Sequence, residues 1–328
     1  MMHRVKRGAC GHINVELMSE VPPFTPRRPL GRCGFHATAL GIGDLADRNV
    51  SLENCVSTLR RAMDAGLNVI DTAPLYEDGY SEEIVGRALS GRRSGMFVID
   101  KIDALDQPAG PQVEQSLARL NLEYTDAFVF HNLSSMEKYD RLTAPGEGFD
   151  QLADCVRTGK TRFRGISSHH PDVLRAAIAA GVCDLVMFPV GPFVDARYVD
   201  EILPLAKAHH VGTVCFKTFG AGKLVADTQG YNQPLQARPR GKVSSGGSDA
   251  TDATLPRLTV AECLHYTLTL DPDVALLGLS FPNEQDQAFA AAREFSPLSN
   301  KQMEDIRRRA VEARQNKGPC WWNPDPEI

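Results

Sequence analysis

Four side chains suited to proton transfer follow short apolar segments of the chain. Asp71 and Tyr76 lie in the stretch NVIDTAPLYEDGYSEE, which starts as an apolar run at Asn68, and Lys101 and His131 each end a later apolar run. A free tyrosine has a pKa near ~10, and a nearby ammonium lowers the pKa of a phenol because it favours the phenolate. We predict that Lys101 acts on Tyr76 in this way and that Asp71 keeps Lys101 charged.

This set of groups is typical of carbonyl–alcohol chemistry. Tyr76 could give its proton to a carbonyl oxygen while hydride reaches the carbon, and such acid–base assistance contributes roughly 10²–10⁴-fold to a rate. His131 could donate a hydrogen bond to the same oxygen and orient it. Each of the four residues alone is more often a cap, a rim residue or a solvent-facing side chain. The interpretation therefore depends on all four meeting in one place.

The spacing of these residues predicts that they meet. Asp71, Lys101 and His131 are thirty residues apart, which is about the length of one strand–helix unit in a barrel. Short apolar runs alternate with amphipathic stretches, which predicts parallel strands joined by right-handed crossovers. Eight runs are strand candidates: residues 37–43, 68–73, 95–101, 126–131, 162–168, 183–188, 212–217 and 274–280. Eight strands, with no GxGxxG after any of them, favour an α/β fold of the (β/α)8 TIM-barrel type over an open dinucleotide-binding sheet.

Several segments lie outside this repeat. We expect three regions: an N-terminal extension over residues 1–28, the barrel over 29–318 and a C-terminal tail over 319–328. Residues 226–256 form a long loop with Gly, Ser and Pro throughout, after the seventh strand and on the face where barrel active sites lie. A charged helix is expected from Ser299 to Lys317. Three glycines are expected to end helices: Gly159, Gly181 and Gly212.

Composition narrows the class of protein. The chain has 328 residues, 42% of them hydrophobic, and a net charge of −5, so nothing indicates the basic face of a nucleic-acid-binding protein. No run approaches the ~20 apolar residues of a membrane span. The eight cysteines form no CxxC pair, which gives little support to a metal or redox site. We expect reduced, mostly buried cysteines in a cytoplasmic protein without a metal centre.

Several motifs resemble the aldo-keto reductase family. They are DTAPLYEDGYSEE, Lys101 after VID, FHN around His131, GISS from Gly165 and the opening PLGRCGFHATALGIG. The resemblance runs from about Pro29 to about Phe295. It implies a (β/α)8 barrel and a nicotinamide cofactor lying across the strand ends. It also implies a catalytic tetrad with Tyr76 as the proton donor, together with Asp71, Lys101 and His131.

The resemblance also implies a set of cofactor contacts, some of them altered in this chain. The candidate cofactor-binding residues are Gly43, Ser167, Ser168, Met187, Phe216, Lys217 and Ser280. Ser168 stands where the family has an asparagine and Met187 where it has a glutamine, which weakens two contacts with the nicotinamide carboxamide. Phe216 could stack on the nicotinamide, and Lys217 could reach the pyrophosphate.

The family's usual contacts with the 2′-phosphate of NADP are missing. Leu279 and about Gln285 occupy the positions of a lysine and an arginine that many members use. NADP(H) is the first choice because the family favours it, and NAD(H) is the competitor. Arg238, Arg240 and Lys242 in the long loop could replace the missing phosphate contacts.

Three functions stay open from the sequence. The first is an NAD(P)H-dependent oxidoreductase that interconverts a carbonyl (aldehyde, ketone or sugar) and an alcohol. The second is an NAD-dependent sugar or polyol dehydrogenase, and the third is a low-turnover regulatory barrel that binds the cofactor. The partner expected is a small-molecule substrate, with no nucleic acid or membrane. Ser167 and Ser168 could instead cap the next helix, and Trp321 and Trp322 could shape a substrate pocket or pack the tail onto outer helices.

Overall fold

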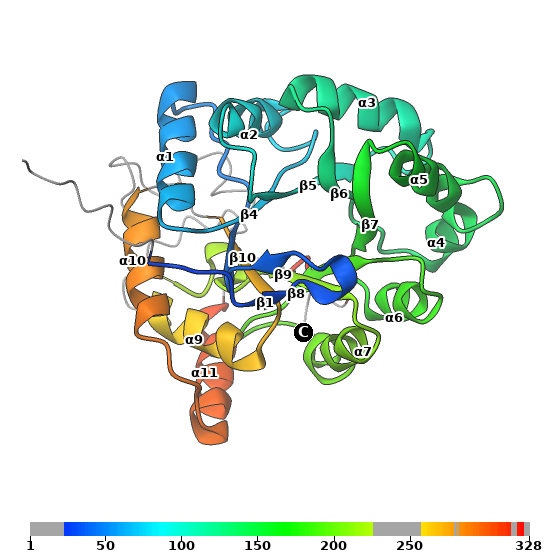
Figure 1. Ribbon diagram of the computed structural model, residues 1–328. Coiled ribbons are helices and arrows are strands. Elements are labelled where there is room, and N and C mark those ends of the chain that lie inside the picture. The colour runs from blue at the N-terminus through cyan, green and yellow to red at the C-terminus, as the bar shows by residue number, and fades with distance from the viewer. Residues whose placement is uncertain (1–22, 226–256, 279, 281, 316–319, 325–328) are drawn as a thin grey trace, which may run out of the picture.

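A closed barrel of eight parallel strands forms the centre of the protein (Figure 1). The computed structural model describes residues 23–225, 257–278, 280, 282–315 and 320–324. The strands are β3 (Leu40–Ile42), β4 (Val69–Asp71), β5 (Phe97–Ile102), β6 (Thr125–Phe130), β7 (Thr161–Ser167), β8 (Leu185–Pro189), β9 (Gly212–Phe216) and β10 (Val274–Leu277). β10 pairs with β3 and closes the barrel. The predicted (β/α)8 fold is confirmed, and each strand lies within or overlaps its predicted run.

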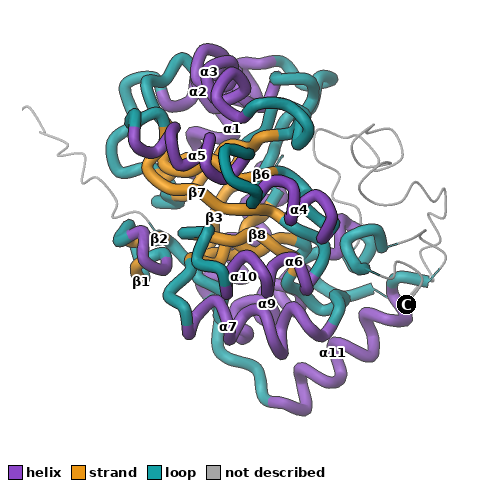
Figure 2. Tube along the Cα trace, turned by 90° about the vertical axis from the view of Figure 1, so that its right-hand side faces the viewer, coloured by secondary structure: helices purple, strands orange, loops and turns teal. Residues whose placement is uncertain are grey.

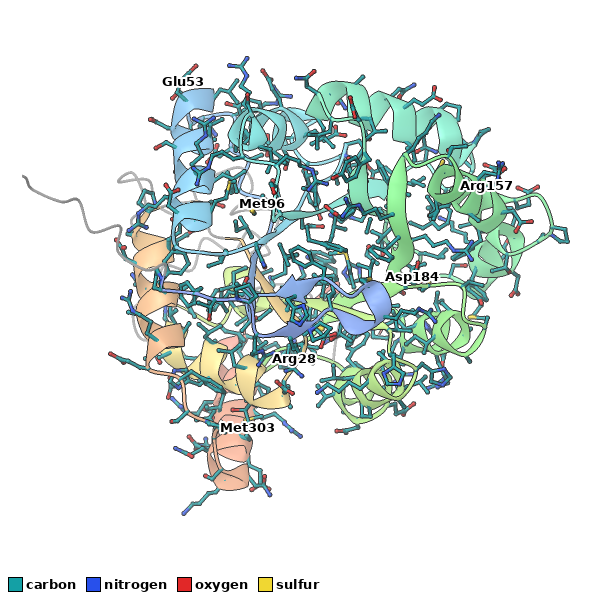
Figure 3. The ribbon with its side chains drawn as sticks, viewed as in Figure 1. Arg28, Glu53, Met96, Arg157, Asp184 and Met303 are labelled. Carbon is teal, nitrogen blue, oxygen red and sulfur yellow. The ribbon has the colours of Figure 1, made fainter. Side chains whose placement is uncertain are left out.

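Helices surround the strands, as Figure 1 shows. They are α1 (Leu52–Asp64), α2 (Tyr80–Leu89), α3 (Ala109–Leu120), α4 (Met136–Leu142), α5 (Gly148–Arg157), α6 (Pro171–Ala179), η2 (Tyr198–Ile202), α7 (Leu203–Ala208), α9 (Val260–Leu270), α10 (Pro282–Arg293) and α11 (Asn300–Ala313), with a short turn η3 at Gly220–Gly222. Charged residues such as Glu53 and Arg157 lie on the outer helices (Figure 3). None of the described helices has both the length and the apolar character needed to cross a membrane.

Strand side chains fill the barrel interior in alternation with those that face the helices. An interior cluster includes Val69, Phe97, Val129, Met187 and Val214, all buried. This packed apolar core makes the barrel a rigid support rather than a pore. The polar side chains of the site lie above it, where the strands end.

A short hairpin lies at the opposite end of the barrel, away from the strand C-termini (Figure 2). It consists of β1 (Arg28–Pro29), the turn η1 (Gly31–Cys33) and β2 (His36–Ala37). The turn fits against the first residue of β9 so closely that a Cβ on Gly31 would lie 2.2 Å from the Gly212 nitrogen. A glycine is therefore required there.

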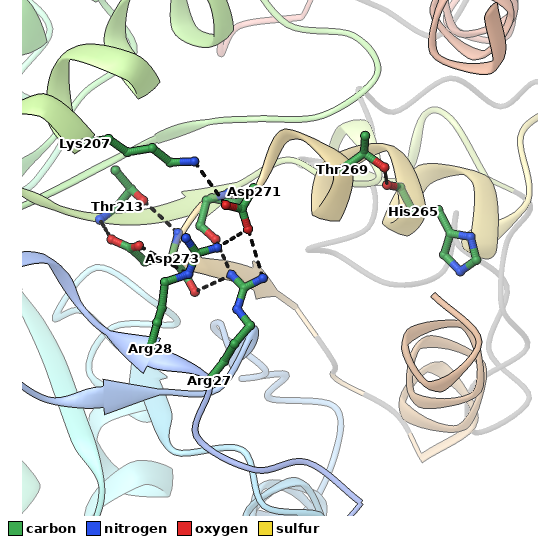
Figure 4. Close-up of polar contacts among 9 residues, drawn as sticks. Arg27, Arg28, Lys207, Thr213, His265, Thr269, Asp271 and Asp273 are labelled. Carbon is green, nitrogen blue, oxygen red and sulfur yellow. Dashed lines mark hydrogen bonds and ion pairs between the residues drawn. The ribbon is translucent and has the colours of Figure 1, made fainter. Parts of the chain in front are cut away.

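Charged residues tie this end of the barrel together (Figure 4). Arg27 Nη1 donates to Asp271 Oδ1 at 3.0 Å, and Lys207 Nζ lies 3.3 Å from Asp271 Oδ2. The Thr213 nitrogen donates to Asp273 Oδ2 at 3.0 Å, and the Asp273 nitrogen donates to Thr213 Oγ1 at 2.8 Å. Arg27, which precedes the predicted barrel boundary at residue 29, thus hydrogen-bonds the segment between α9 and β10.

Three glycines were predicted to end helices, and two of them do. Gly159 and Gly181 follow the ends of α5 and α6 with φ of 77° and 69°, as expected of residues just past a helix end. Gly212 does not end a helix, because α7 stops at Ala208 and Gly212 is the first residue of β9. His210 takes the left-handed conformation instead, with φ of 54°. All seven cysteines within the described ranges are buried, and none of them forms a disulfide.

Candidate active site

A buried ion pair joins the ends of β4 and β5. Lys101 Nζ lies 2.6 Å from Asp71 Oδ1 and donates to the Thr72 carbonyl at 2.7 Å. Both side chains are almost fully buried. Burial lowers the pKa of Lys101, but Asp71 and Tyr76 more than offset this and leave the pKa above its usual value. Burial raises the pKa of Asp71, and Lys101 opposes that rise. The close contact with Asp71 keeps Lys101 an ammonium at neutral pH.

Tyr76 lies on the loop after β4, beside this ammonium. Lys101 Nζ is 4.3 Å from the centre of the Tyr76 ring. The loop turns sharply, with φ of 51° at Glu77 and 79° at Gly79, and the Gly79 nitrogen donates to the Pro74 carbonyl at 2.7 Å. These contacts bring the phenol back over the end of the barrel.

The pKa of Tyr76 differs from the sequence prediction. Burial raises this pKa above its ordinary value, and the Lys101 ammonium opposes the rise. The prediction was correct for the direction of the effect of Lys101 and wrong for the net pKa. Moving the Tyr76 phenolate out of water costs free energy. This cost exceeds the attraction of the Lys101 ammonium, which also interacts with Asp71. Tyr76 is therefore a protonated phenol across neutral pH.

His131 directly follows β6 and completes the predicted group of four. Its ring centre lies 5.5 Å from that of Tyr76, with the ring planes at 87°. Its Nδ1 hydrogen-bonds Asp103 Oδ1. Asp103 Oδ2 also accepts a hydrogen bond from the Leu75 nitrogen at 2.8 Å. All four predicted residues thus come together at the strand ends, and a fifth, Asp103, joins them.

Asp103 was missed in the sequence, although a signal existed. It is the first residue after β5, which ends at Ile102, just as His131 is the first after β6, which ends at Phe130. Two residues that leave neighbouring parallel strands at the same level meet at the same rim. The register pairs Ile102 with Phe130, so the contact follows directly from the strand alignment.

Asp100 lies in β5 next to Lys101, with its side chain on the opposite face of the strand, and it should affect stability. It is fully buried. Oδ1 accepts from the Lys101 nitrogen at 2.8 Å, whereas Oδ2 has no hydrogen-bond partner among the described residues. Burial, followed by the nearby carboxylate of Glu82, raises the pKa of Asp100 well above its usual value. The native state therefore binds this proton more tightly than the unfolded chain does.

A raised carboxyl pKa gives stability that is present at low pH and is lost as pH rises through the folded-state value. We expect Asp100→Asn to stabilise the protein relative to wild type by a margin that widens with pH, up to about 1–3 kcal/mol. Urea unfolding of both proteins between pH 5 and pH 9 measures this margin. Asp106→Asn, at an exposed position of the following loop, is the matched control. A margin that is the same at every pH would contradict the assignment.

The two predicted serines already hold backbone groups. Ser167 Oγ accepts from the Asn132 nitrogen at 2.9 Å. Ser168 Oγ accepts from the His170 nitrogen at 3.0 Å, which forms the turn that leads into α6. The predicted capping of α6 by these serines is wrong, because its N-cap is His170 and no side chain makes a capping bond there. Met187 lies in the apolar interior cluster, where it offers a surface rather than a hydrogen bond.

Phe216 and Lys217 end β9 at the same rim. The Phe216 ring lies 5.4 Å from the ring of His169. Lys217 has an unusual backbone φ of 77°, and strain of this kind is concentrated at functional sites. The next residue, Thr218, is buried, and its Oγ1 has no partner among the described residues. The buried Thr218 hydroxyl can hydrogen-bond a polar ligand, and the ammonium of the adjacent Lys217 can bind an anionic one. The residues at this rim therefore fit a nicotinamide dinucleotide.

The remaining cofactor candidates, Ser280 and Gly43, follow β10 and β3, the next two strands after β9 around the barrel. The Gly43 nitrogen donates to the Leu277 carbonyl at 2.7 Å, and a Cβ on Gly43 would approach that carbonyl to 3.2 Å. The Ser280 nitrogen hydrogen-bonds Glu284 Oε2 at 3.1 Å. Gln285 is buried and donates to the Thr58 carbonyl at 2.8 Å, so it is part of the helix packing. Leu279, Arg238, Arg240 and Lys242 lie outside the described residues.

The C-terminal tail reaches the barrel mouth through two adjacent tryptophans. Trp321 is 43% exposed, and its ring lies 5.0 Å from that of His169 and 4.2 Å from Lys217 Nζ. Trp322 is fully buried, and its Nε1 donates to the Phe193 carbonyl at 3.0 Å. Trp322 thus anchors the tail, and Trp321 lies at the rim beside His169 and Lys217, where shaping a substrate pocket stays a prediction.

His169 lies between the tail and the site, with its ring near those of Trp321 and Phe216. Its Nδ1 is 3.1 Å from Asn132 Oδ1, and its backbone nitrogen donates to Ser134 Oγ at 2.8 Å. Burial, followed by Lys217 and His131, lowers the pKa of His169 to about 3. This imidazole is neutral at every physiological pH.

Comparisons with known proteins agree with this arrangement. The model of the Aldo/keto reductase family matches residues 38–310. L-galactose dehydrogenase of Arabidopsis thaliana is 26% identical over 295 residues, which cover 84% of this chain and 90% of that protein. An NADH-specific methylglyoxal reductase of Escherichia coli is 25% identical over 63% of this chain and 69% of that protein.

Solved structures share the fold. An aldo-keto reductase from Bacillus halodurans in its holo form has a TM-score of 0.66 and 23% identity, covering 88% of this chain and 99% of that one. A Klebsiella pneumoniae aldo-keto reductase in complex with NADPH has a TM-score of 0.63 and 21% identity, covering 89% and 99% of the two chains. With the family model matching most of the sequence, the chain belongs to the aldo/keto reductase family.

Proposed function

We propose that this protein is an NAD(P)(H)-dependent oxidoreductase that interconverts a carbonyl compound and an alcohol, with Tyr76 as the proton donor in reduction. The observation that carries the proposal is the buried Lys101–Asp71 pair, 2.6 Å apart, with its ammonium 4.3 Å from the centre of the Tyr76 ring. A barrel without a reaction to catalyse has no physical need to bury an ion pair beside a phenol, because removing both charges from water costs free energy.

Each residue has a distinct task in this reaction. Tyr76 holds a proton at its hydroxyl, ready for the substrate oxygen. Lys101 favours the phenolate that remains after transfer, and Asp71 keeps Lys101 charged. His131 orients the oxygen through a hydrogen bond. When bound, the nicotinamide supplies or accepts the hydride, and the protein supplies placement and electrostatics.

The cofactor would lie across the strand ends. Phe216, Lys217 and Thr218 after β9, Ser280 after β10 and Gly43 after β3 would contact it from three neighbouring strand ends. NADP(H) is the first choice and NAD(H) the competitor, and similar proteins include both an NADPH complex and an NADH-specific enzyme. A fluorescence titration with NADPH and NADH decides between them. An Arg238, Arg240 and Lys242 triple-alanine variant tests whether the loop sets the preference, since an unchanged NADPH/NADH ratio would rule that out.

The proposed function is tested by turnover. Wild-type protein should reduce members of a panel of aldehydes, ketones and sugars with NADPH or NADH, or oxidise the matching alcohols. Absence of turnover with every substrate and both cofactors would leave the low-turnover regulatory barrel. The engaged hydroxyls of Ser167 and Ser168 and the apolar setting of Met187 support that second candidate.

A dehydrogenase that works mainly in the oxidising direction on a sugar or polyol is the other alternative. The similarity to L-galactose dehydrogenase along most of both chains favours it. Faster turnover of sugars with NAD than of aldehydes with NADPH would select this alternative.

The tail residue Trp321 should affect the substrate more than the fold. We expect Trp321→Ala to raise KM for the substrate about 2- to 10-fold, because the contacts of one aromatic ring contribute about 0.5–1.5 kcal/mol. Stability should change little, since the side chain is partly exposed. Trp322→Ala should instead destabilise the protein by about 3–5 kcal/mol, because it removes a buried ring. Steady-state kinetics and urea unfolding separate the two effects. If KM were unchanged for every substrate, Trp321 would lie outside the pocket.

A further inference from the structure

Asp103 joins two parts of the site through one carboxylate. Oδ1 contacts His131 Nδ1, and Oδ2 accepts from the Leu75 nitrogen at 2.8 Å, one residue before Tyr76. Its side chain is 11% exposed. The same group therefore fixes both the histidine ring and the start of the loop that carries the phenol.

The contact with Asp103 determines where His131 carries its proton. A carboxylate accepts hydrogen bonds and donates none, and here both oxygens face a nitrogen. His131 Nδ1 must then carry the proton that it donates to Asp103. A neutral imidazole has only one N–H, so Nε2 of neutral His131 has a lone pair. Nε2 makes no hydrogen bond to any residue in the described part of the chain.

This proton position conflicts with the task of His131 while the imidazole is neutral. A substrate carbonyl oxygen also presents lone pairs, so it needs a donor. Nε2 becomes a donor only when His131 gains a second proton, and the carboxylate of Asp103 is placed to stabilise that imidazolium. In serine proteases an aspartate fixes the tautomer of the catalytic histidine by the same kind of contact.

Among the residues that the structure describes, no carboxylate other than Asp103 hydrogen-bonds His131. The groups that face it from neighbouring strand ends are Tyr76, the Lys101–Asp71 pair and His169. Asp71 is already bound by Lys101 at 2.6 Å. His169 contacts an amide oxygen of Asn132 rather than a carboxylate, so of these two imidazoles only His131 has an acidic partner.

We propose that Asp103 is a positioning residue that makes hydrogen-bond donation by His131 to a carbonyl substrate depend on a second proton on the imidazole. Neutral His131, with its one proton on Nδ1, then cannot donate to the substrate oxygen. This inference rests on the proposed function, and it adds a positioning residue and a protonation requirement to it. Burial raises the pKa of Tyr76 above its ordinary value, so loss of the Tyr76 proton does not produce the same dependence.

The Asp103→Asn variant should move the proton of neutral His131 from Nδ1 to Nε2 while keeping a side chain of the same size at position 103. The oxygen of the introduced amide can still accept from the Leu75 nitrogen, while its NH₂ group donates to His131 Nδ1. Neutral His131 must then carry its proton on Nε2, which makes it a donor at every pH. Asp106→Asn, three residues along the same loop and exposed, is the matched control.

Two measurements test the proposal on the full-length protein. Nitrogen-15 NMR of the histidine rings should place the proton of neutral His131 on Nδ1 in wild type and on Nε2 in Asp103→Asn. In wild type, kcat/KM for reduction should fall roughly 10- to 100-fold as the NMR signal reports loss of the second proton, the range expected for a hydrogen bond from a charged donor. Over the same pH range, Asp103→Asn should be flat and Asp106→Asn should follow wild type.

Several outcomes would overturn the proposal. One is a neutral wild-type His131 protonated on Nε2, and another is a kcat/KM for reduction that does not follow the protonation of His131. A third is an Asp103→Asn profile that falls as wild type does. Thermal melting and the cofactor titration show whether Asp103→Asn is folded and binds. If wild type turns over no substrate, the proposed function fails, while NMR still decides whether Asp103 fixes the imidazole.

Discussion

Replacing Tyr76 with phenylalanine should lower turnover by at least about 10²–10⁴-fold, the usual contribution of a positioned acid, and should leave cofactor binding nearly unchanged. The variant removes only the hydroxyl. The ring that packs 5.5 Å from His131 and beneath the Lys101 ammonium stays in place. Initial rates and a fluorescence titration with NADPH and NADH measure the two effects separately.

A nearby tyrosine provides the control for this variant. Tyr80 opens α2, and its hydroxyl donates to the Val50 carbonyl at 3.1 Å. Tyr80→Phe removes the same atom from the same part of the chain, away from the Lys101–Asp71 pair, and should leave turnover within about twofold of wild type. If Tyr76→Phe lost cofactor binding together with activity, Tyr76 would have a structural role and the assignment as proton donor would fail.

Replacing Lys101 with methionine should have the largest combined effect on activity and stability. The variant leaves Asp71 as a buried carboxylate without its partner, and breaking a buried pair in this way costs about 3–5 kcal/mol. It also removes the group that favours the Tyr76 phenolate, so turnover should fall as it does in Tyr76→Phe. Urea unfolding gives the loss of stability, and initial rates give the loss of turnover.

A second variant separates the two effects of Lys101. The Lys101→Met, Asp71→Asn double variant contains no unpaired charge, so it should regain much of the lost stability and none of the activity. Lys160→Met breaks a pair with Glu114 on the surface and should cost about 1 kcal/mol or less. If Lys101→Met were as stable as wild type, the pair with Asp71 would not be the buried contact described above.

The strand ends could be predicted from the sequence because barrels are periodic. Asp71, Lys101 and His131 recur at the interval of one strand–helix unit, and parallel strands of similar length bring such residues to one rim. The short, β-branched and aromatic runs likewise predicted all eight strands. The ends of individual helices were predicted less accurately. Gly212 was assigned to a helix end, yet it opens β9, because a glycine signals a break in the chain without saying which element follows.

The sequence by itself determined the barrel, the family and the four side chains suited to proton transfer, since each depends on residue type and spacing along the chain. The tertiary structure alone decided the environment of those side chains. Burial, which depends on everything packed around the phenol, raised the pKa of Tyr76 against the effect of Lys101. The contact of Asp103 with His131 and the approach of Trp321 to His169 join residues from separate segments. Such contacts depend on strand register and on where the tail folds, and neither is encoded in the spacing of a single motif.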